Sequence, residues 1–120
     1  HQLKLLLKIL DDSHAIFLIH VPINEESLFN SVSSYVKERD PKGTGNVFIA
    51  KHRYPYTLRH INQVFLELSG FWELFDLADW DYAINLSNFD WPLRHNQDIH
   101  KLLMNNPGYS YLDMFQDTSK

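Results

Sequence analysis

The stretch "AIFLIHV", Ala15 to Val21, decides the fold class, because every residue in it except the histidine is apolar and most are β-branched or aromatic. A continuous apolar run of this length is typical of a strand that is covered on both faces of a parallel sheet. Pro22 follows directly and ends the run. We therefore predict a central strand here and an α/β fold around it.

Helical and strand-like patterns alternate along the rest of the chain. Residues 2–12 place leucines at helical spacing with two lysines opposite, which predicts an amphipathic helix packed on a sheet rather than one lying on a membrane. Asn24 and Asn96 are expected to cap two further helices. After the first strand, the expected elements are a helix over 24–40, a strand over 46–50 ("NVFIA"), a helix over about 57–75, a strand over 79–86 ("DWDYAINL"), a helix over about 96–106 and a possible strand over 109–114 ("YSYLDM").

This alternation predicts βαβ units, and so a Rossmann-like, mostly parallel sheet with helices on both faces. The chain shows no internal repeat or linker and begins without an initiator Met, so we interpret residues 1–120 as a single partial domain. Ligands bind outside the carboxyl ends of the strands in open sheets of this kind. The rule selects three places: His20 to Pro22, Lys51 to Tyr56, and Ser87 to Pro92.

Composition and charge exclude several classes of protein. The net charge is −4 and the basic residues are scattered, so the basic patch of a nucleic-acid binder is missing. No cysteine is present, which excludes disulfides and thiolate chemistry but does not fix the compartment. No apolar run approaches the roughly 18 to 20 residues of a spanning helix. Any membrane attachment is expected through a segment absent from this chain.

The motifs of common catalytic and phosphate sites are also missing. Neither GxGxxG nor GxxxxGK[ST] occurs, and Ser87 in "NLSNF" lacks the glycines of a nucleophile elbow. Among the seven histidines only His52 and His60 come near ligand-like spacing, so we favour surface or hydrogen-bonded histidines over a metal site. His20, at the end of the buried strand, is expected to bond to neighbouring backbone rather than to a ligand.

Two groups of polar residues remain open to two interpretations. Asp90 stands shortly after a predicted strand and before Trp91-Pro92, where it either closes a turn or projects over the strand ends. Arg53 and Lys51 stand near Tyr56 in the second loop. Cations and aromatic faces of this kind can hold a diphosphate and a base, but a solvated loop has the same composition.

Three blocks of the sequence then match one family. "HAIFLIHV" resembles a strand that ends in IHVD, and "NVFIA" resembles NVFVA. "WDYAINLSNFDWPLRHNQDI", residues 80–99, resembles the signature W-x-Y-x-INLSGxDFPLKTNxEI. From about residue 3 to 103, the chain is similar to the core-2/I-branching N-acetylglucosaminyltransferases and peptide-O-xylosyltransferases.

The resemblance implies the donor-binding half of a GT-A-like, inverting glycosyltransferase. Its donor would be a UDP-sugar carrying GlcNAc, xylose or glucuronic acid, and its acceptor a hydroxyl of a glycan or glycoprotein. It implies no cofactor and no DxD-bound metal, and a lumenal location as a type II protein of the Golgi membrane. The family's catalytic base lies in a C-terminal half outside this chain. No catalytic residue is therefore assigned, and residues 1–120 alone are expected to be inactive.

The chain departs from the family pattern at one position of the expected nucleotide site. Where the family has an aspartate that contacts uridine this chain has Pro22, whose side chain cannot accept a hydrogen bond, so a diverged, non-catalytic binding or scaffold domain is the alternative. An unrelated flavodoxin-like module is a third, more distant interpretation.

By the same resemblance, six residues are expected at the site. Those expected to line the nucleotide site are Val21, Pro22, Arg53 and Tyr56, and those expected in the sugar or acceptor pocket are Ser87 and Asp90. For Asp90 we favour this pocket role over a plain turn role.

Overall fold

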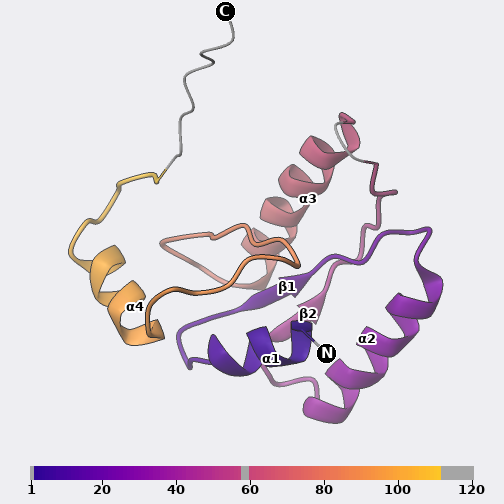
Figure 1. The fold of residues 1–120 in the computed structure, drawn as a ribbon, viewed down its shortest axis with the longest axis horizontal. Coiled ribbons are helices and arrows are strands. Elements are labelled where there is room, and N and C mark those ends of the chain that lie inside the picture. Colours follow the sequence, from indigo (N-terminus) through magenta and orange to yellow (C-terminus); the bar gives the residue numbers. More distant parts are fainter. Residues whose placement is uncertain (1, 58–59, 112–120) are drawn as a thin grey trace, which may run out of the picture.

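Two short parallel strands lie at the centre of the computed structural model, which describes residues 2–57 and 60–111 (Figure 1). Strand β1 (Phe17–Ile19) pairs with β2 (Val47–Ile49), with Phe17 opposite Val47 and Ile19 opposite Ile49. The helix between them, α2 (Glu26–Arg39), supplies the crossover that parallel strands require. The prediction of a parallel α/β arrangement is thus confirmed for these two strands.

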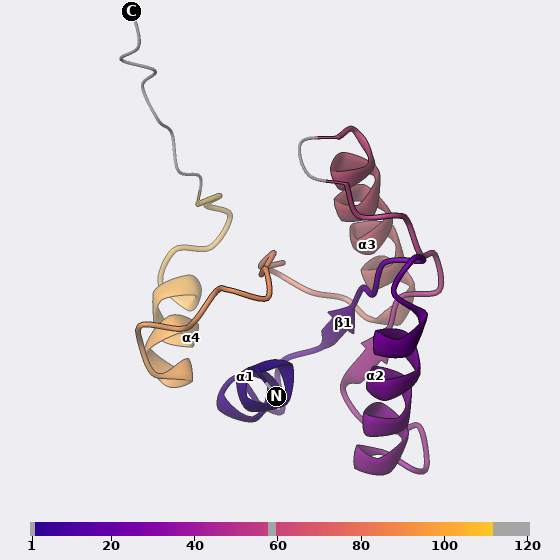
Figure 2. The same ribbon diagram turned by 45° about the vertical axis from the view of Figure 1, so that its right-hand side comes forward.

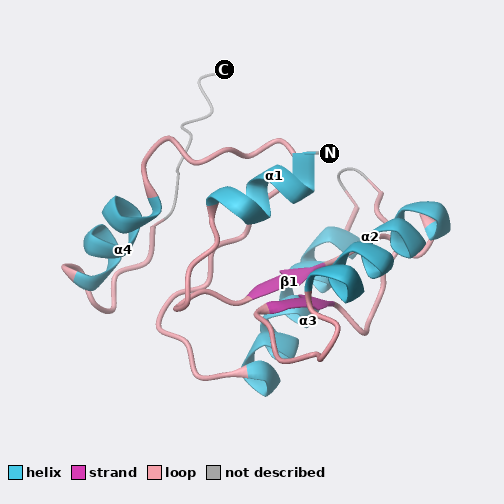
Figure 3. Cartoon of the chain, turned by 90° about the horizontal axis from the view of Figure 1, so that it is seen from below, coloured by secondary structure: helices cyan, strands magenta, loops and turns pink. Residues whose placement is uncertain are grey.

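The helices lie on both sides of this sheet. Figure 3 shows α1 (Gln2–Ile9) and α2 on one side of the strands and α3 (Asn62–Leu77) on the other. Helix α4 (Asn96–Met104) stands apart from the sheet on the side of α1 (Figure 2). Among the helices that the structure describes, none combines the length and the apolar character needed to cross a membrane.

The core is formed where α1 and α2 meet the same face of the sheet. Because side chains alternate along a strand, Ile19 and Val21 point to the face on which Val47 also lies. They pack with Leu7 of α1 and Val32 of α2, and all five are buried. Each such side chain contributes about 1.5–3 kcal/mol to stability by leaving water. The prediction that the first helix packs on a sheet is confirmed.

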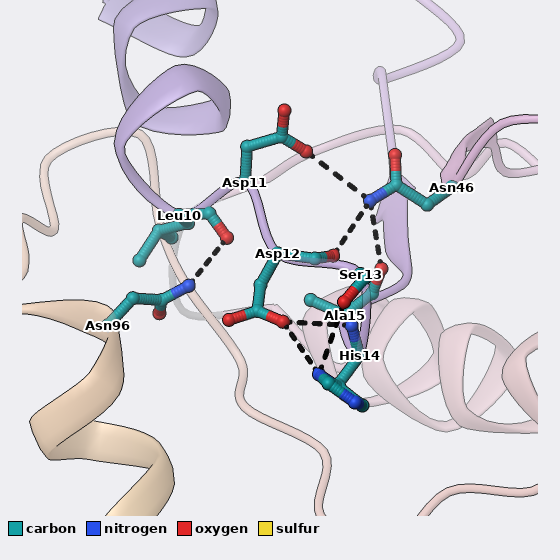
Figure 4. Close-up of polar contacts among 8 residues, drawn as sticks. All are labelled: Leu10, Asp11, Asp12, Ser13, His14, Ala15, Asn46 and Asn96. Atoms are coloured by element: carbon teal, nitrogen blue, oxygen red, sulfur yellow. Dashed lines mark hydrogen bonds and ion pairs between the residues drawn. The ribbon is translucent and has the colours of Figure 1, made fainter.

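Two asparagine side chains tie the segment between α1 and β1 to distant parts of the chain (Figure 4). Asn46, just before β2, donates from Nδ2 to the carbonyl oxygen of Ala15 at 3.0 Å and to that of Asp12 at 3.3 Å. Asn96 donates from Nδ2 to the carbonyl oxygen of Leu10 at 3.0 Å. Asn96 is therefore not the cap that we predicted: it is the first residue of α4, and its side chain holds that helix against the end of α1.

Other predicted boundaries shift for local reasons. The cap position of α2 is Glu25, not Asn24, because the Glu25 N–H donates to the carbonyl oxygen of Pro22 at 3.0 Å and so places a turn over Ile23 and Asn24. Helix α3 covers residues 62–77 where 57–75 was predicted. The possible last strand is not formed at residues 109–111, and residues 112–114 lie outside the described part of the chain.

The strand predicted over residues 79–86 is wrong, since this segment pairs with neither β1 nor β2. Its side chains contact α3 and the residues just after α4 instead. Trp80 stacks on Phe75 of α3 with ring centroids 4.7 Å apart, and the Tyr82 hydroxyl donates to the carbonyl oxygen of Asn106 just after α4. Ile84 stays 60% exposed, so the burial that the apolar pattern predicted is not realised in this segment.

Candidate functional site

The carboxyl ends of β1 and β2 bring two of the three predicted places together. The Tyr54 N–H donates to Nε2 of His20 at 3.1 Å, and the Ile23 N–H donates to the carbonyl oxygen of Tyr54 at 3.3 Å. Residues 20–23 and 51–56 therefore form one continuous edge beyond the sheet. This is the edge at which open α/β sheets bind ligands.

Arg53 holds this edge together. Its Nε donates to the carbonyl oxygen of Val21 at 3.1 Å and its Nη2 to that of Pro22 at 2.9 Å. Nη1 pairs with the Glu26 carboxylate at 3.0 Å, and the guanidinium lies 3.9 Å from the centre of the Phe29 ring. A guanidinium has five N–H groups, so these three hydrogen bonds leave two that bond to none of the described residues, on a side chain that is 14% exposed. Arg53 is thus a structural clamp as well as a cation at the site.

Val21 and Pro22 reach the site through their backbone. The Val21 side chain is only 2% exposed because it belongs to the core. The carbonyl oxygen of Pro22 accepts from both Arg53 and the Glu25 N–H. The structure therefore brings Val21, Pro22 and Arg53 into contact, but Val21 and Pro22 make these contacts through main-chain oxygens.

His20 lies half-buried beneath the loop and is bonded to backbone, as predicted. Because its Nε2 accepts from an N–H, that nitrogen carries no proton and the ring is neutral. Burial lowers the pKa of His20, and the charge of Arg53 lowers it further while Glu73 opposes the shift. His20 therefore supports the loop in its neutral form.

Glu73 of α3 is a site residue that the sequence did not reveal. Its two carboxylate oxygens accept from the Lys51 N–H at 2.8 Å and from the His52 N–H at 2.9 Å, and His52 Nδ1 lies 3.0 Å away. Burial raises the pKa of Glu73, but these hydrogen bonds outweigh it and leave the pKa below its usual value. No motif marks this residue, because its partners lie 21 and 22 positions earlier and meet it only in the fold.

Among the described residues, no hydrogen bond joins Tyr56, Ser87 or Asp90 to the contacts of Arg53 with Val21 and Pro22. Tyr56 is 51% exposed and its hydroxyl accepts from Gln63 at 3.3 Å. Asp90 accepts the Ser87 N–H at 2.5 Å, and this bond lowers the pKa of Asp90. Asp90 therefore closes a turn, and within the described residues no hydrogen bond joins that turn to residues 20–23 or 51–56.

The groups along the edge formed by residues 20–23 and 51–56 suit a polar ligand. It contains one partly exposed guanidinium, a neutral imidazole and a loop whose amides are fixed by a carboxylate. The fixed backbone lowers the entropy that a ligand must remove on binding. Such an edge can hold a phosphate or a hydroxyl-bearing ring.

Comparison with known proteins points to one group. The sequence model of the family described as Core-2/I-Branching enzyme matches residues 1–120. The xylosyltransferase sqv-6 of Caenorhabditis elegans is 27% identical over 114 residues, which cover 92% of this chain and 14% of that protein. The chain thus spans about a seventh of the length of this relative. No solved structure matches the chain.

Proposed function

The chain belongs to the Core-2/I-branching enzyme family, and on this premise we propose that it forms the donor-binding part of a glycosyltransferase. The family match over all 120 residues is the observation that carries the proposal. The site geometry supports it, because two parallel strands end side by side and their loops form the edge where ligands bind in open α/β sheets. A GT-A-like architecture belongs to the same proposal.

The reaction is a direct displacement at a sugar carbon. An acceptor hydroxyl, deprotonated by a carboxylate, attacks C1 of a UDP-linked GlcNAc, xylose or glucuronic acid, and UDP leaves with inversion of configuration. Without a DxD-bound metal, cationic side chains stabilise the charge on the diphosphate. The acceptor is a hydroxyl of a glycan or protein in the Golgi lumen. The base lies outside residues 1–120, so these residues alone are not expected to turn over substrate.

Each site residue then has a distinct task. Arg53 directs its two remaining N–H groups to the donor while it holds the loop. Val21 and Pro22 line the nucleotide site, and their carbonyl oxygens hold Arg53 in place there. Tyr56 provides an exposed aromatic face at the end of the same loop. Ser87 and Asp90 shape the sugar or acceptor pocket from the turn that they close.

Calorimetric titration with UDP-GlcNAc, UDP-xylose and UDP-glucuronic acid tests the proposal. We expect saturable binding of at least one donor, and at least tenfold weaker binding in Tyr56→Ala. Tyr109→Ala is the matched control, because Tyr109 is another exposed tyrosine, 67% exposed and just after α4. If no donor binds saturably, the transferase proposal fails.

A non-catalytic scaffold or binding domain is the second candidate. Two observations favour it: Pro22 stands where the family has an aspartate, and the charge of Arg53 is already paired with Glu26. Both reduce the polar contacts available to a nucleotide. The same titration decides between the candidates, because a scaffold keeps the fold and binds none of the three donors.

A further inference from the structure

The loop after β2 is fixed by hydrogen bonds from two parts of the fold. Residues 19–23, at the end of β1, bond to Ala50, Arg53 and Tyr54. The two residues between Ala50 and Arg53 bond instead to Glu73 of α3, a helix on the side of the strands opposite to α1 and α2 (Figure 3). The backbone that leads into Arg53 is therefore held from α3.

The Glu73 carboxylate is turned toward this loop. One oxygen accepts the Lys51 N–H at 2.8 Å, and the other accepts the His52 N–H at 2.9 Å and lies 3.0 Å from His52 Nδ1. The Glu73 side chain is only 12% exposed, so little of it meets solvent. Glu73 therefore acts on the loop and not directly on a ligand.

The charge of Glu73 alone would weaken the binding of an anion. The diphosphate of a UDP-sugar is anionic, and the loop contributes two cations toward it, Lys51 and Arg53. Glu26 already pairs with Arg53 at 3.0 Å. A second carboxylate at the same loop adds to the repulsion of the diphosphate. Electrostatics and positioning thus predict opposite effects when this charge is removed.

We propose that Glu73 is a positioning residue of the donor site, which holds residues 51–52 so that Arg53 meets the diphosphate; this inference rests on the proposed transferase function. A loop that is already fixed loses less conformational entropy when a ligand binds. Without Glu73, the segment between β2 and Arg53 loses its two hydrogen bonds to α3. Donor affinity then falls, although a negative charge has been removed.

Calorimetric titration of Glu73→Gln with the three UDP-sugars and with inorganic diphosphate tests the inference. For each ligand that binds the wild type, the Kd should rise at least about fivefold. Asp76→Asn is the matched control, because Asp76 is exposed, belongs to the same helix and makes no hydrogen bond within the described residues. It removes the same charge without releasing the loop, so its Kd should equal that of the wild type or be lower.

Glu73→Asp separates reach from charge. It keeps the carboxylate but is one methylene shorter, so it should hold the two amides less well and raise the Kd at least about twofold. Nuclear magnetic resonance monitors the loop without any ligand. The amide signals of residues 51 and 52 should shift in both Glu73 variants, while signals far from the loop stay in place and show that the fold is retained.

Three results overturn the inference: a Kd for Glu73→Gln no higher than that of the wild type, an equal rise in Asp76→Asn, or unshifted amide signals at residues 51 and 52. A residue that only stabilised the fold would leave the Kd of the folded protein unchanged. The two proposals fail separately. Donor binding that is unchanged in the Glu73 variants refutes the positioning role alone. Diphosphate binding that depends on Glu73, without binding of any UDP-sugar, refutes the transferase function alone, and no binding of any probe refutes both.

Discussion

Arg53 donates from Nη2 to the carbonyl oxygen of Pro22 at 2.9 Å, and this bond joins the loop after β2 to the end of β1. The contact links the residue expected to bind phosphate to the residue that departs from the family pattern. A carbonyl oxygen is present in every residue type, so the clamp does not depend on proline at this position. The proposed donor contact and the observed clamp use the same Arg53 side chain, so measurements must separate stability from donor binding.

Arg53→Lys should lower the free energy of unfolding by about 2 kcal/mol, because a lysine reaches fewer of the acceptors that the guanidinium now holds. Urea denaturation measures the loss. Arg94→Lys is the matched control: Arg94 is exposed, and its replacement should stay within about 0.5 kcal/mol. Equal urea midpoints for the two variants would show that the clamp does not stabilise the fold.

His20→Gln should remove a pH dependence of stability. Burial holds the pKa of His20 below 6.5, so the unfolded chain takes up the proton first as the pH falls. Stability from this residue is complete above pH 6.5 and declines below it, down to the folded pKa. A glutamine oxygen still accepts the Tyr54 N–H without titrating. The free energy of unfolding, measured by urea denaturation between pH 7.5 and 5, should therefore decrease more with falling pH for the wild type than for His20→Gln. Equal decreases for the two proteins would refute the assignment.

Glu73→Gln should cost about 1–2 kcal/mol at pH 7, because an amide offers one oxygen to two loop N–H groups. The pKa of Glu73 is depressed, so its contribution is present above pH 4.5 and is lost as the pH falls toward the folded pKa. The difference between wild type and variant should shrink below pH 4.5 in urea denaturation. Glu38→Gln, on the exposed side of α2, should differ little at any pH. A difference that persists at pH 3 would contradict the predicted role of the charge.

Elements with a local signal in the sequence form as predicted. The apolar run 15–21 and the leucine pattern of the first helix specify burial by their own spacing, and the structure has both. Elements whose structure depends on distant partners differ from the prediction. The 79–86 segment has a strand-like pattern but makes its contacts with α3 and with residues near α4. Glu73 is invisible for the same reason, since only the fold brings it to the loop amides.

Gly70→Ala should raise the free energy of unfolding by about 1 kcal/mol, because alanine loses less backbone entropy in a helix. Nothing lies within 4 Å of a methyl group added at Gly70, so no clash offsets the gain. Gly108→Ala is the opposing control: its φ of 78° favours glycine, and alanine there should destabilise by about 1 kcal/mol. Thermal unfolding measures both. A lower melting temperature for Gly70→Ala would mean that α3 packs more closely than the structure shows.

Asp90→Asn should lower the melting temperature at pH 7, because an amide oxygen replaces the carboxylate that accepts the Ser87 N–H at 2.5 Å. The pKa of Asp90 is depressed below 3.8, so the contribution of the charge is present above that pH and is lost as the pH falls further. The two proteins should therefore converge in thermal unfolding below pH 3.8. Asp81→Asn, an exposed aspartate in the preceding segment, provides the control.

The same variant separates the turn role from the proposed pocket role. A turn alone predicts a loss of stability with donor affinity unchanged once the protein is folded. An unchanged melting temperature with weaker ligand binding would instead show that Asp90 acts on the ligand and that the turn does not need it. Because the Asp90 carboxylate has a second oxygen, it can close the turn through one oxygen and face a ligand through the other. That arrangement predicts losses in both measurements.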